Sequence, residues 1–542
     1  MSRSFCIRTE RMNDMKKRKM KLTTAGRVVI FAIILAILGG GGYFGYNLLS
    51  KNDAPTAQVQ TTGGDTSGTQ SSDTTKPANT TTNKSNTDDP TINLSLDEWI
   101  GWKPIIDANG GLTTQPGSIF DQLGINVNLN IINDAEASSN ALIKGNLNAA
   151  GYTLNRTAFL SGKFKEAGLD VVMPVFTNYS DGGDGIIALS QYDSIESLVD
   201  AKIGVPKFSE AQTLVIWFVN KSDLPDADKQ KIISNLILLD DAEQTGQAFF
   251  AGSLDVAATW QPYLSNAENS TNSHILFSTA SSNKLIMDGI VFRSDFAQAH
   301  PDVVSAFIDG IFKANDMYET EFKYMREVMP MYAAASDEEI VANCADAGLM
   351  GYAANVSALE DDCPTLYADM CQIWESIGEK VDRSLGATLF DTTYVKALST
   401  SYSTIPEKKT VEITEEQKEA AIDAVALLTK TATINFVPDT AKFLDNAEAD
   451  AVLSNFVELA KILDGTIIQI EGNINAKTNT EAGQKLSEER AKTVRNYFVA
   501  NGIDANRIIV VGNGNSKMLA DPSGPDAEMN RRTDVYFKTI ED

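Results

Sequence analysis

The feature that most constrains this chain is an uncharged apolar segment near its N-terminus. Residues 28–49 carry no charged side chain across 22 positions. An α-helix needs about 20 apolar residues to cross a bilayer. The preceding residues, 1–27, hold nine Lys or Arg and only two Asp or Glu. Because basic flanks stay on the cytoplasmic side, we expect a single-pass anchor in the cell membrane, with a cytoplasmic N-terminus and an extracytoplasmic bulk.

A cleaved signal peptide is the alternative interpretation of the same segment. The run is long for a signal peptide, no A-x-A cleavage site follows it, and no cysteine at its end marks a lipoprotein. We therefore expect one uncleaved transmembrane helix. The next stretch, residues 50–90, is almost entirely Thr, Ser, Asn, Asp, Gly, Lys and Pro, which cannot bury enough surface to offset the entropy of ordering. It predicts a disordered linker.

Charge and cysteine usage exclude several classes of function. The whole chain has a formal net charge of −26 although its first 27 residues carry +7, so the remainder is strongly acidic and is not expected to bind nucleic acid. No CxxC or HxxxH spacing occurs, so we expect no metal site, and nothing indicates a cofactor. Cys344 and Cys363 form a disulfide in an oxidising space or remain free buried thiols, and both readings stay open.

From residue 91 to about 405, short apolar runs alternate with helical stretches, which indicates an α/β architecture with a largely parallel sheet. The expected strands are 92–97, 124–132, 201–208, 254–260 and 284–292. The expected helices are 137–146, 209–220, 242–252 and 301–316. In open sheets of this kind, ligands lie at the carboxyl ends of the strands, where helix N-termini offer backbone N–H groups.

Several segments of this region carry a family resemblance in their order along the chain. They are SLDEWIGWKPIIDANGG, ALIKGNLNAAGY, SLVDAKIGVPKFSEAQTLVIWFV, AFFAGSLDVAATWQPYLSNA and DGIVFRSDFAQAHPDVVSAFIDGIFKA. Together they resemble the nitrate/sulfonate/taurine class of ABC-transporter substrate-binding proteins, closely over residues 92–315 and loosely over 316–405. The resemblance implies a two-lobed periplasmic-binding-protein fold, a small-molecule solute between the lobes, and an ABC permease as partner.

The strand ends and helix starts of this region supply the candidate ligand-binding residues. They are Trp99, Trp102, Ser139, Asn140, Ser209, Glu210, Trp260, Gln261 and Asp288. Aromatic walls and amides suit a cleft, and Asp288 would accept from an amino group. The competing readings are a packed aromatic pair at the two tryptophans and helix capping at the serines. Since Arg156 is the single candidate for an arginine clamp, the solute class stays open among sulfonate, nitrate and small amine.

An enzyme is not expected. The two histidines are His274, in a polar loop, and His300, just before a helix, and no GxSxG, HExxH or Walker-type loop occurs. The SDGGDG stretch with Asp181 and Asp184 is most simply a turn. Residues 406–430 predict a connector with an amphipathic helix that includes Val425 and Leu428.

Residues 431–542 resemble the OmpA-like peptidoglycan-binding domain, most clearly in KLSEERAKTVRNYF and NRRTDVYF. The resemblance implies a small α/β fold whose first strand begins at INF (434–436). It also implies peptidoglycan as a partner, whose peptide stem offers a carboxylate to an Arg and an ammonium to an Asp. The matching positions are Asn475, Arg490, Asn530 and Arg531. This chain has Asn473 and Asn475 where the family has His and Asp, so a docking module without wall binding is the alternative.

Two functions follow from these patterns. The first is a membrane-anchored, extracytoplasmic solute-binding receptor for an ABC-type importer, whose C-terminal module binds or docks to peptidoglycan. The second is a structural connector between wall and membrane, or a sensor, with a binding domain that does not serve transport. A ligand bound between the lobes would favour the first function.

Overall fold

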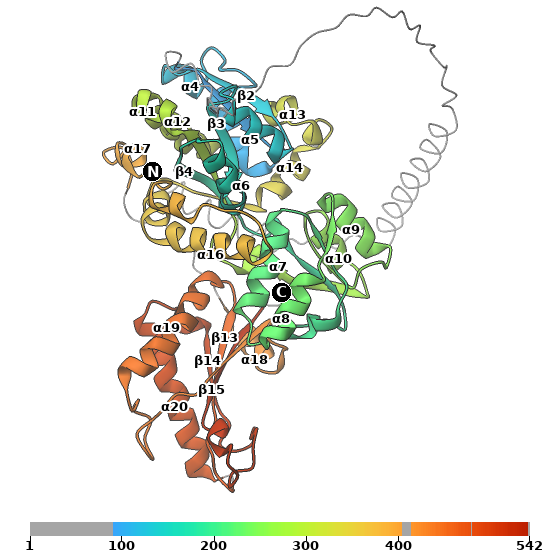
Figure 1. The fold of residues 1–542 in the computed structure, drawn as a ribbon, viewed down its shortest axis with the longest axis vertical. Helices are drawn as coiled ribbons and strands as arrows, with labels where there is room; N and C mark the ends of the chain where they lie inside the picture. The colour runs from blue at the N-terminus through green and yellow to red at the C-terminus, as the bar shows by residue number, and fades with distance from the viewer. Residues whose placement is uncertain (1–89, 404–412, 479, 540–542) are drawn as a thin grey trace, which may run out of the picture. The chain divides into compact units, whose positions relative to one another are not determined.

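The computed structural model describes residues 90–403, 413–478 and 480–539 (Figure 1). The N-terminal tail, the anchor predicted at 28–49 and the linker that follows it lie outside these residues, as does part of the connector. No helix in the described ranges has the length and apolar character needed to span a bilayer. The described part contains three β-sheets with helices packed on them, a mixed α/β architecture.

The first lobe is built on a six-stranded sheet with the order β11-β4-β10-β3-β1-β2. Its strands are β1 (Ile92–Leu96), β2 (Val127–Ile131), β3 (Ala149–Thr153), β4 (Val171–Ser180), β10 (Met287–Arg293) and β11 (Ala347–Leu349). Strand β1 runs parallel to β2 and β3, whereas β10 runs antiparallel to β3 and β4. The edge strand β11 is antiparallel to β4.

The second lobe is built on a five-stranded sheet with the order β7-β6-β8-β5-β9. Its strands are β5 (Asp184–Leu189), β6 (Ile203–Pro206), β7 (Ile237–Leu239), β8 (Val256–Trp260) and β9 (Ser273–Ser278). Strand β6 is parallel to β7 and β8, and β5 is antiparallel to β8 and β9. His274 therefore lies in a strand and not in the expected loop.

The expectation of a largely parallel sheet is met only in part, because each lobe has a mixed sheet in which most strands share one direction. The chain passes from β4 directly into β5, and from β9 through a short turn back into β10. A strand that enters a sheet from the neighbouring lobe starts at the edge where the other strands end, so it must run in the opposite direction. Strands β5 and β10 are those entering strands, and each is antiparallel to its neighbours.

The helices expected in the two lobes are present, with shifted ends. Between residues 103 and 314 the helices are α3 (Lys103–Asn109), α4 (Ile119–Gln122), α5 (Ala135–Ile143), α6 (Leu154–Glu166), α7 (Glu210–Lys221), α8 (Asp226–Ser234), α9 (Ala242–Phe250), α10 (Tyr263–Glu268), α11 (Ser294–Ala299) and α12 (Pro301–Ala314). Helix α7 is apolar on nearly all sides, and its residues 211–219 are all buried, as expected of a helix covered by other elements.

The loosely matching region after residue 316 is mostly helical. It contains α13 (Lys323–Val328), α14 (Asp337–Cys344), α15 (Tyr352–Ser357), α16 (Cys363–Ser376) and α17 (Thr393–Lys396). Helix α16 packs on α6 of the first lobe and on α7 of the second. The three cysteines here, Cys344, Cys363 and Cys371, are buried free thiols, so the Cys344–Cys363 disulfide does not form and the free-thiol alternative holds in this structure.

The C-terminal module has a four-stranded sheet with the order β12-β15-β13-β14. Its elements are α18 (Glu415–Asp423), β12 (Leu428–Ala432), α19 (Asn446–Ile462), β13 (Ile467–Gly472), α20 (Glu481–Ala500), β14 (Ile508–Gly512) and β15 (Thr533–Lys538). In Figure 1, α19 and α20 lie together along one side of the strands. Ile468 and Ile470 of β13 share a core with Val494 of α20, while Ile467 packs against Ala421 of α18.

Two expectations for this module are wrong. Its first strand is Leu428–Ala432, which pairs with β15, and not the segment that begins at Ile434. The connector helix stops at Asp423, so Val425 lies beyond its end and Leu428 is a strand residue. Alternating Thr residues in LTKTA favour a strand, and pairing with β15 satisfies their backbone groups.

Candidate functional site

The first lobe brings three acceptors and two tryptophans to one edge of its sheet. Asp97 directly follows β1 and accepts a hydrogen bond from Trp102 Nε1 at 2.6 Å. Trp99 Nε1 donates to Asn178 Oδ1, near the end of β4, at 2.9 Å. Asp288, at the start of β10, pairs in register with Asn178 and with the last residue of β3. Trp102 is fully buried, so it supports Asp97 and offers no free face to a ligand.

The second lobe supplies the facing groups. Asp184 is the first residue of β5 and is opposite Trp260, the last residue of β8. Trp260 is 37% exposed, which leaves part of its ring open to solvent. Glu210 is the first residue of α7, after β6. The neighbouring Ser209 donates to Pro206 O at 2.6 Å and accepts from Gln212 N at 3.2 Å, so its hydroxyl caps the helix, as the alternative reading held.

One ion pair joins the two lobes at this edge. Arg156 of α6 donates to Glu210 of α7, with Nη2 to Oε2 at 3.0 Å and Nε to Oε1 at 3.3 Å. Thr153, at the end of β3, donates to the same carboxylate at 2.7 Å. Burial acts to raise the pKa of Glu210, but the charge and hydrogen bonds of Arg156 and the bond from Thr153 outweigh it, so the pKa is lowered. Arg156, the candidate for an arginine clamp on the solute, is therefore already paired with Glu210.

The remaining carboxylates of the edge lack such a partner. Burial raises the pKa of Asp184 to about 7 and the pKa of Asp288 well above its ordinary value. The negative charges of Asp97, Glu210 and Asp184 raise the pKa of Asp288 further. Thr153, which is opposite Asp288 in the sheet, donates to Glu210. We call the five residues Asp97, Arg156, Asp184, Glu210 and Asp288 the acidic cluster.

The other candidates of the lobes lie elsewhere. Helix α5 begins at Ala135 under an Asp134 cap, so Ser139 and Asn140 are mid-helix residues and do not open it. Ser139 donates to Glu136 O at 2.9 Å and accepts from Lys163 Nζ at 3.0 Å. Gln261 accepts from Ser265 at the start of α10. Of the predicted residues, the structure gathers Trp99, Glu210, Asp288 and Trp260 around one edge.

Sequence reasoning missed two members of the acidic cluster. Asp97 was not singled out although it directly follows a buried strand, which is the position where a site residue is expected. Asp184 was set aside as part of a turn, whereas it begins β5 and is 9% exposed. Nothing in the local sequence distinguishes this aspartate from Asp181 three residues earlier.

Among the candidate wall-binding residues of the C-terminal module, Asn475 and Asn530 form a hydrogen-bonded pair, and Arg490 contacts other residues. Asn475 accepts from Asn530 Nδ2 at 3.1 Å and donates to Pro522 O at 3.1 Å. Arg490 donates through Nε to Thr440 O at 3.0 Å, and its guanidinium lies over the ring of Phe436 at 4.8 Å. Burial lowers the pKa of Arg490, the charge of Asp439 opposes this, and the charge of Arg531 lowers the pKa further. Among the described ion pairs, none includes Arg490, so its remaining N–H groups suit a carboxylate ligand.

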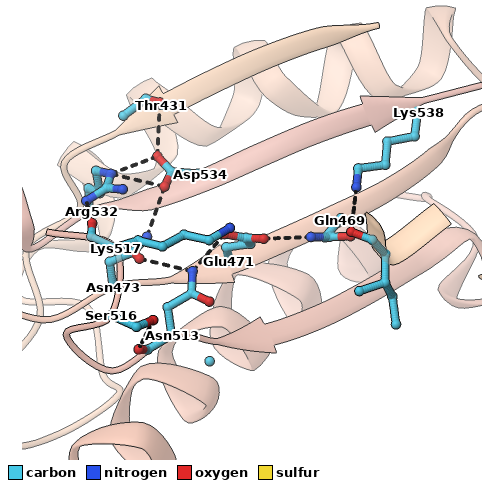
Figure 2. A network of polar contacts seen from close by, with 12 residues as sticks. Thr431, Gln469, Glu471, Asn473, Asn513, Ser516, Lys517, Arg532, Asp534 and Lys538 are labelled. Atoms are coloured by element: carbon cyan, nitrogen blue, oxygen red, sulfur yellow. Dashed lines mark hydrogen bonds and ion pairs between the residues drawn. The ribbon is translucent and has the colours of Figure 1, made fainter. Parts of the chain in front are cut away.

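A separate polar network fills the same module beside this site, and Figure 2 shows its dashed contacts across the sheet. Glu471 accepts from Lys517 at 2.7 Å, from Asn513 at 2.7 Å and from Gln469 at 2.6 Å. Although burial acts to raise it, the pKa of Glu471 is lowered by the hydrogen bonds from Lys517, Asn513 and Gln469 and by the charge of Lys517.

Asp534 anchors the other half of that network. It lies 3.0 Å from Arg532 Nε and accepts from Thr431 at 3.0 Å and from Asn473 at 2.9 Å. Asn473, at the position where the resembled family has His, is thus a structural residue that bridges Asp534 to Asn513. It is buried, and its amide both donates and accepts a hydrogen bond.

Comparisons with known proteins match the two parts of the chain separately. Residues 435–532 match the OmpA family model. Over 112 residues the chain is 31% identical to photosystem I P700 chlorophyll a apoprotein A2 of Gloeobacter violaceus, covering 19% of this chain and 13% of that one. Over 104 residues it is 31% identical to outer membrane porin F of Pseudomonas aeruginosa, covering 19% and 29%. The chain thus spans less than a third of the length of either relative.

Among solved structures, the periplasmic aliphatic sulphonate binding protein SsuA from Escherichia coli aligns with a TM-score of 0.45 and 12% identity. That alignment covers 56% of this chain and 99% of the other. The C-terminal match rests on the family model. Residues 435–532 of this chain therefore form an OmpA-family domain.

Proposed function

We propose that this chain is an extracytoplasmic solute-binding receptor that delivers its solute to an ABC-type permease. Residues 28–49 would hold it in the cell membrane, and the OmpA domain would bind peptidoglycan through Arg490 and Arg531. The proposal takes the solute to lie at the edge where the two lobes meet, against Trp99, Trp260 and the acidic cluster.

The observation that carries the proposal is the acidic cluster itself. Its five side chains come from β5, β10, the end of β1, α6 and α7, and these elements belong to both lobes. Buried ionisable groups at the edge where the neighbouring strands end are costly for a purely structural core. Such groups are expected where a bound ligand supplies their missing hydrogen bonds and charges. A ligand that contacts groups from both lobes would also hold the two lobes together.

Thermal unfolding of the full chain in detergent against a panel of small amines, sulfonates, nitrate and phosphate tests the receptor function. A ligand at 100 times its Kd stabilises by about 2.7 kcal/mol, so a concentration-dependent rise of the melting temperature is expected with one class. Trp260→Ala should weaken that rise, because part of the ring is free to contact a ligand. A panel without any shift would contradict the receptor function.

The wall-binding role has its own test. The full chain is sedimented with purified peptidoglycan, and Arg490→Ala is compared with Arg495→Ala on the same helix. Loss of co-sedimentation with the first variant and retention with the second are expected, because only Arg490 has its guanidinium beside Phe436 and Arg531. Equal binding by both variants would contradict the role given to Arg490.

The second candidate function, a connector or sensor between wall and membrane, is favoured by one observation. The Arg156–Glu210 pair already joins the two lobes without a solute. Peptidoglycan binding together with an empty cluster in every ligand assay would support the connector.

A further inference from the structure

The acidic cluster has an unbalanced charge. It contains four carboxylates and one guanidinium, and that guanidinium is held by Glu210 through two hydrogen bonds. None of the ion pairs between described residues includes Asp97, Asp184 or Asp288. Among the described residues, Asp184 and Asp288 therefore have no cation beside them, and Asp97 has only the attraction of Arg156.

Asp288 is the member of the acidic cluster whose negative charge is least stabilised by the protein. It is 5% exposed, it makes no ion pair, and the carboxylates of Asp97, Glu210 and Asp184 act on it electrostatically. Trp99 acts to lower the pKa of Asp288, but the 2.9 Å hydrogen bond of Trp99 Nε1 goes to Asn178 Oδ1. Within a protein, a carboxylate in these surroundings is stable when it is protonated or when a cation lies against it.

Solvent reaches the cluster at Asp97. That residue is exposed, whereas Asp184 and Asp288 are buried, so the cluster has an open side and a closed side. Its carboxylate is fixed by the 2.6 Å bond from the buried Trp102. Asp97 is therefore the member of the cluster most accessible to a solute.

Aromatic faces border the same edge. Trp99 packs so closely over Gly183 that a Cβ there would lie 2.6 Å from the indole ring. Trp260 is opposite Asp184 and is partly exposed. Indole rings attract cations through their faces, and they would do so here beside carboxylates. The described residues contain no group of three or more His, Cys, Asp or Glu that could hold a metal ion.

We propose that the solute of this site is an organic cation, an ammonium or guanidinium compound whose N–H groups bind Asp288, Asp184 and Asp97 against Trp99 and Trp260. The proposal rests on the receptor function given above and names the chemical class of its solute. An anion such as a sulfonate or nitrate would face three carboxylates, and Arg156, the cation of the cluster, is already paired with Glu210.

The test is calorimetric titration of the full chain with agmatine and methylammonium, and in parallel with methanesulfonate and nitrate. Saturable binding of a cation and no binding of the anions are expected. Asp288→Asn should weaken cation binding at least about 30-fold, because it removes one partner of a buried charge pair. Asp193→Asn, an exposed aspartate of the second lobe, is the matched control and should bind as the parent does.

The outcomes separate the two proposals. Binding of an anion alone, unchanged by Asp288→Asn, would overturn the cation class and leave the receptor function intact. No binding of either class would overturn both. If Asp288→Asn fails to fold, Asp184→Asn gives the same measurement, and the melting temperature of each variant without ligand is a second readout. Replacing an unmatched carboxylate should raise that temperature, whereas a purely structural role for the carboxylate would lower it.

Discussion

The OmpA domain and the acidic cluster both bury carboxylates, and they treat them in opposite ways. In the domain, Glu471 has Lys517 beside it and Asp534 has Arg532, and neutral side chains take the remaining positions. In the cluster, Asp184 and Asp288 are as deeply buried but have no cation. The pKa of Glu471 is lowered. Burial raises the pKa of Asp534 in spite of Arg532, and it raises the pKa of Asp288, which has no such cation, well above its ordinary value.

This contrast separates a structural network from a binding site. A matched network stabilises one arrangement of the strands, and any added ligand would have to displace a satisfied partner. An unmatched cluster lowers the stability of the empty protein and gains the most from a ligand of opposite charge. Three measurements would sharpen or break the comparison.

The largest effect is expected where a matched pair is broken. Arg532→Met leaves Asp534 buried without its cation, which should lower the free energy of unfolding of the OmpA domain by about 3–5 kcal/mol. Denaturant unfolding of the full chain, followed on the transition of that domain, measures it. Arg531→Met, at the exposed neighbouring position, should change the stability by less than about 0.5 kcal/mol. Similar losses in the two variants would show that the network is not matched as described.

The second effect is a loss of stability of the two lobes as the pH rises. The pKa of Asp184 is raised by burial from 3.8 to about 7, so the folded state binds the proton more tightly than the unfolded state does. The resulting stability is fully present below about pH 4 and is lost as the pH rises through 7. Between about pH 5 and 8 the loss from this group is about 2–3 kcal/mol.

Asp184→Asn isolates that contribution, because Asp107 and Asp346 also have a pKa raised to about 7 by burial and contribute in the same direction. Melting temperatures of the parent and the variant across this pH range should converge at low pH and separate at high pH, with the variant more stable. Parallel curves would mean that Asp184 does not titrate in the folded protein.

The smallest effect is expected at the ion pair between the lobes. Glu210→Gln removes the charge but keeps hydrogen-bonding atoms near Arg156 and Thr153, and both side chains of the pair are partly exposed. A loss of about 1–2 kcal/mol is expected for a hydrogen-bonded charge in this setting. The variant should also release Arg156, so weak nitrate binding that appears only in Glu210→Gln would confirm that the parent site is closed to anions. Unchanged stability would show that the pair does not hold the lobes.

Most of the elements could be predicted from local patterns. The strands at β1, β2, β6, β8 and β10 and the helices α5, α7, α9 and α12 lie where apolar periodicity indicated them. The errors concern segments whose type or direction is set by pairing with strands far away in the chain. Leu428 continued an apparently amphipathic helix, yet it pairs with β15, and the antiparallel strands β5 and β10 have apolar sequences that read the same in either direction.

The candidate site could be predicted less completely than the fold, because its residues differ in how clearly the local sequence marks their position in a helix or strand. Trp260, Glu210 and Asp288 follow or begin elements and were found by that position. Asp184 was not found, because an aspartate beside two glycines has the same local signature whether it forms a turn or begins a buried strand. Ser139 was predicted wrongly at a helix start, because the helix takes the earlier Asp134 as its cap.

By itself, the sequence determined the order and type of most elements, the OmpA domain at residues 435–532 and the replacement of its expected His and Asp by Asn473 and Asn475. These properties depend on neighbours one to four residues apart, which the sequence displays directly. Only the tertiary structure decided that Asp97, Asp184 and Asp288 share one edge and that Arg156 is taken by Glu210. Strand order and strand direction bring those residues together, and both are set by contacts between segments far apart in the chain.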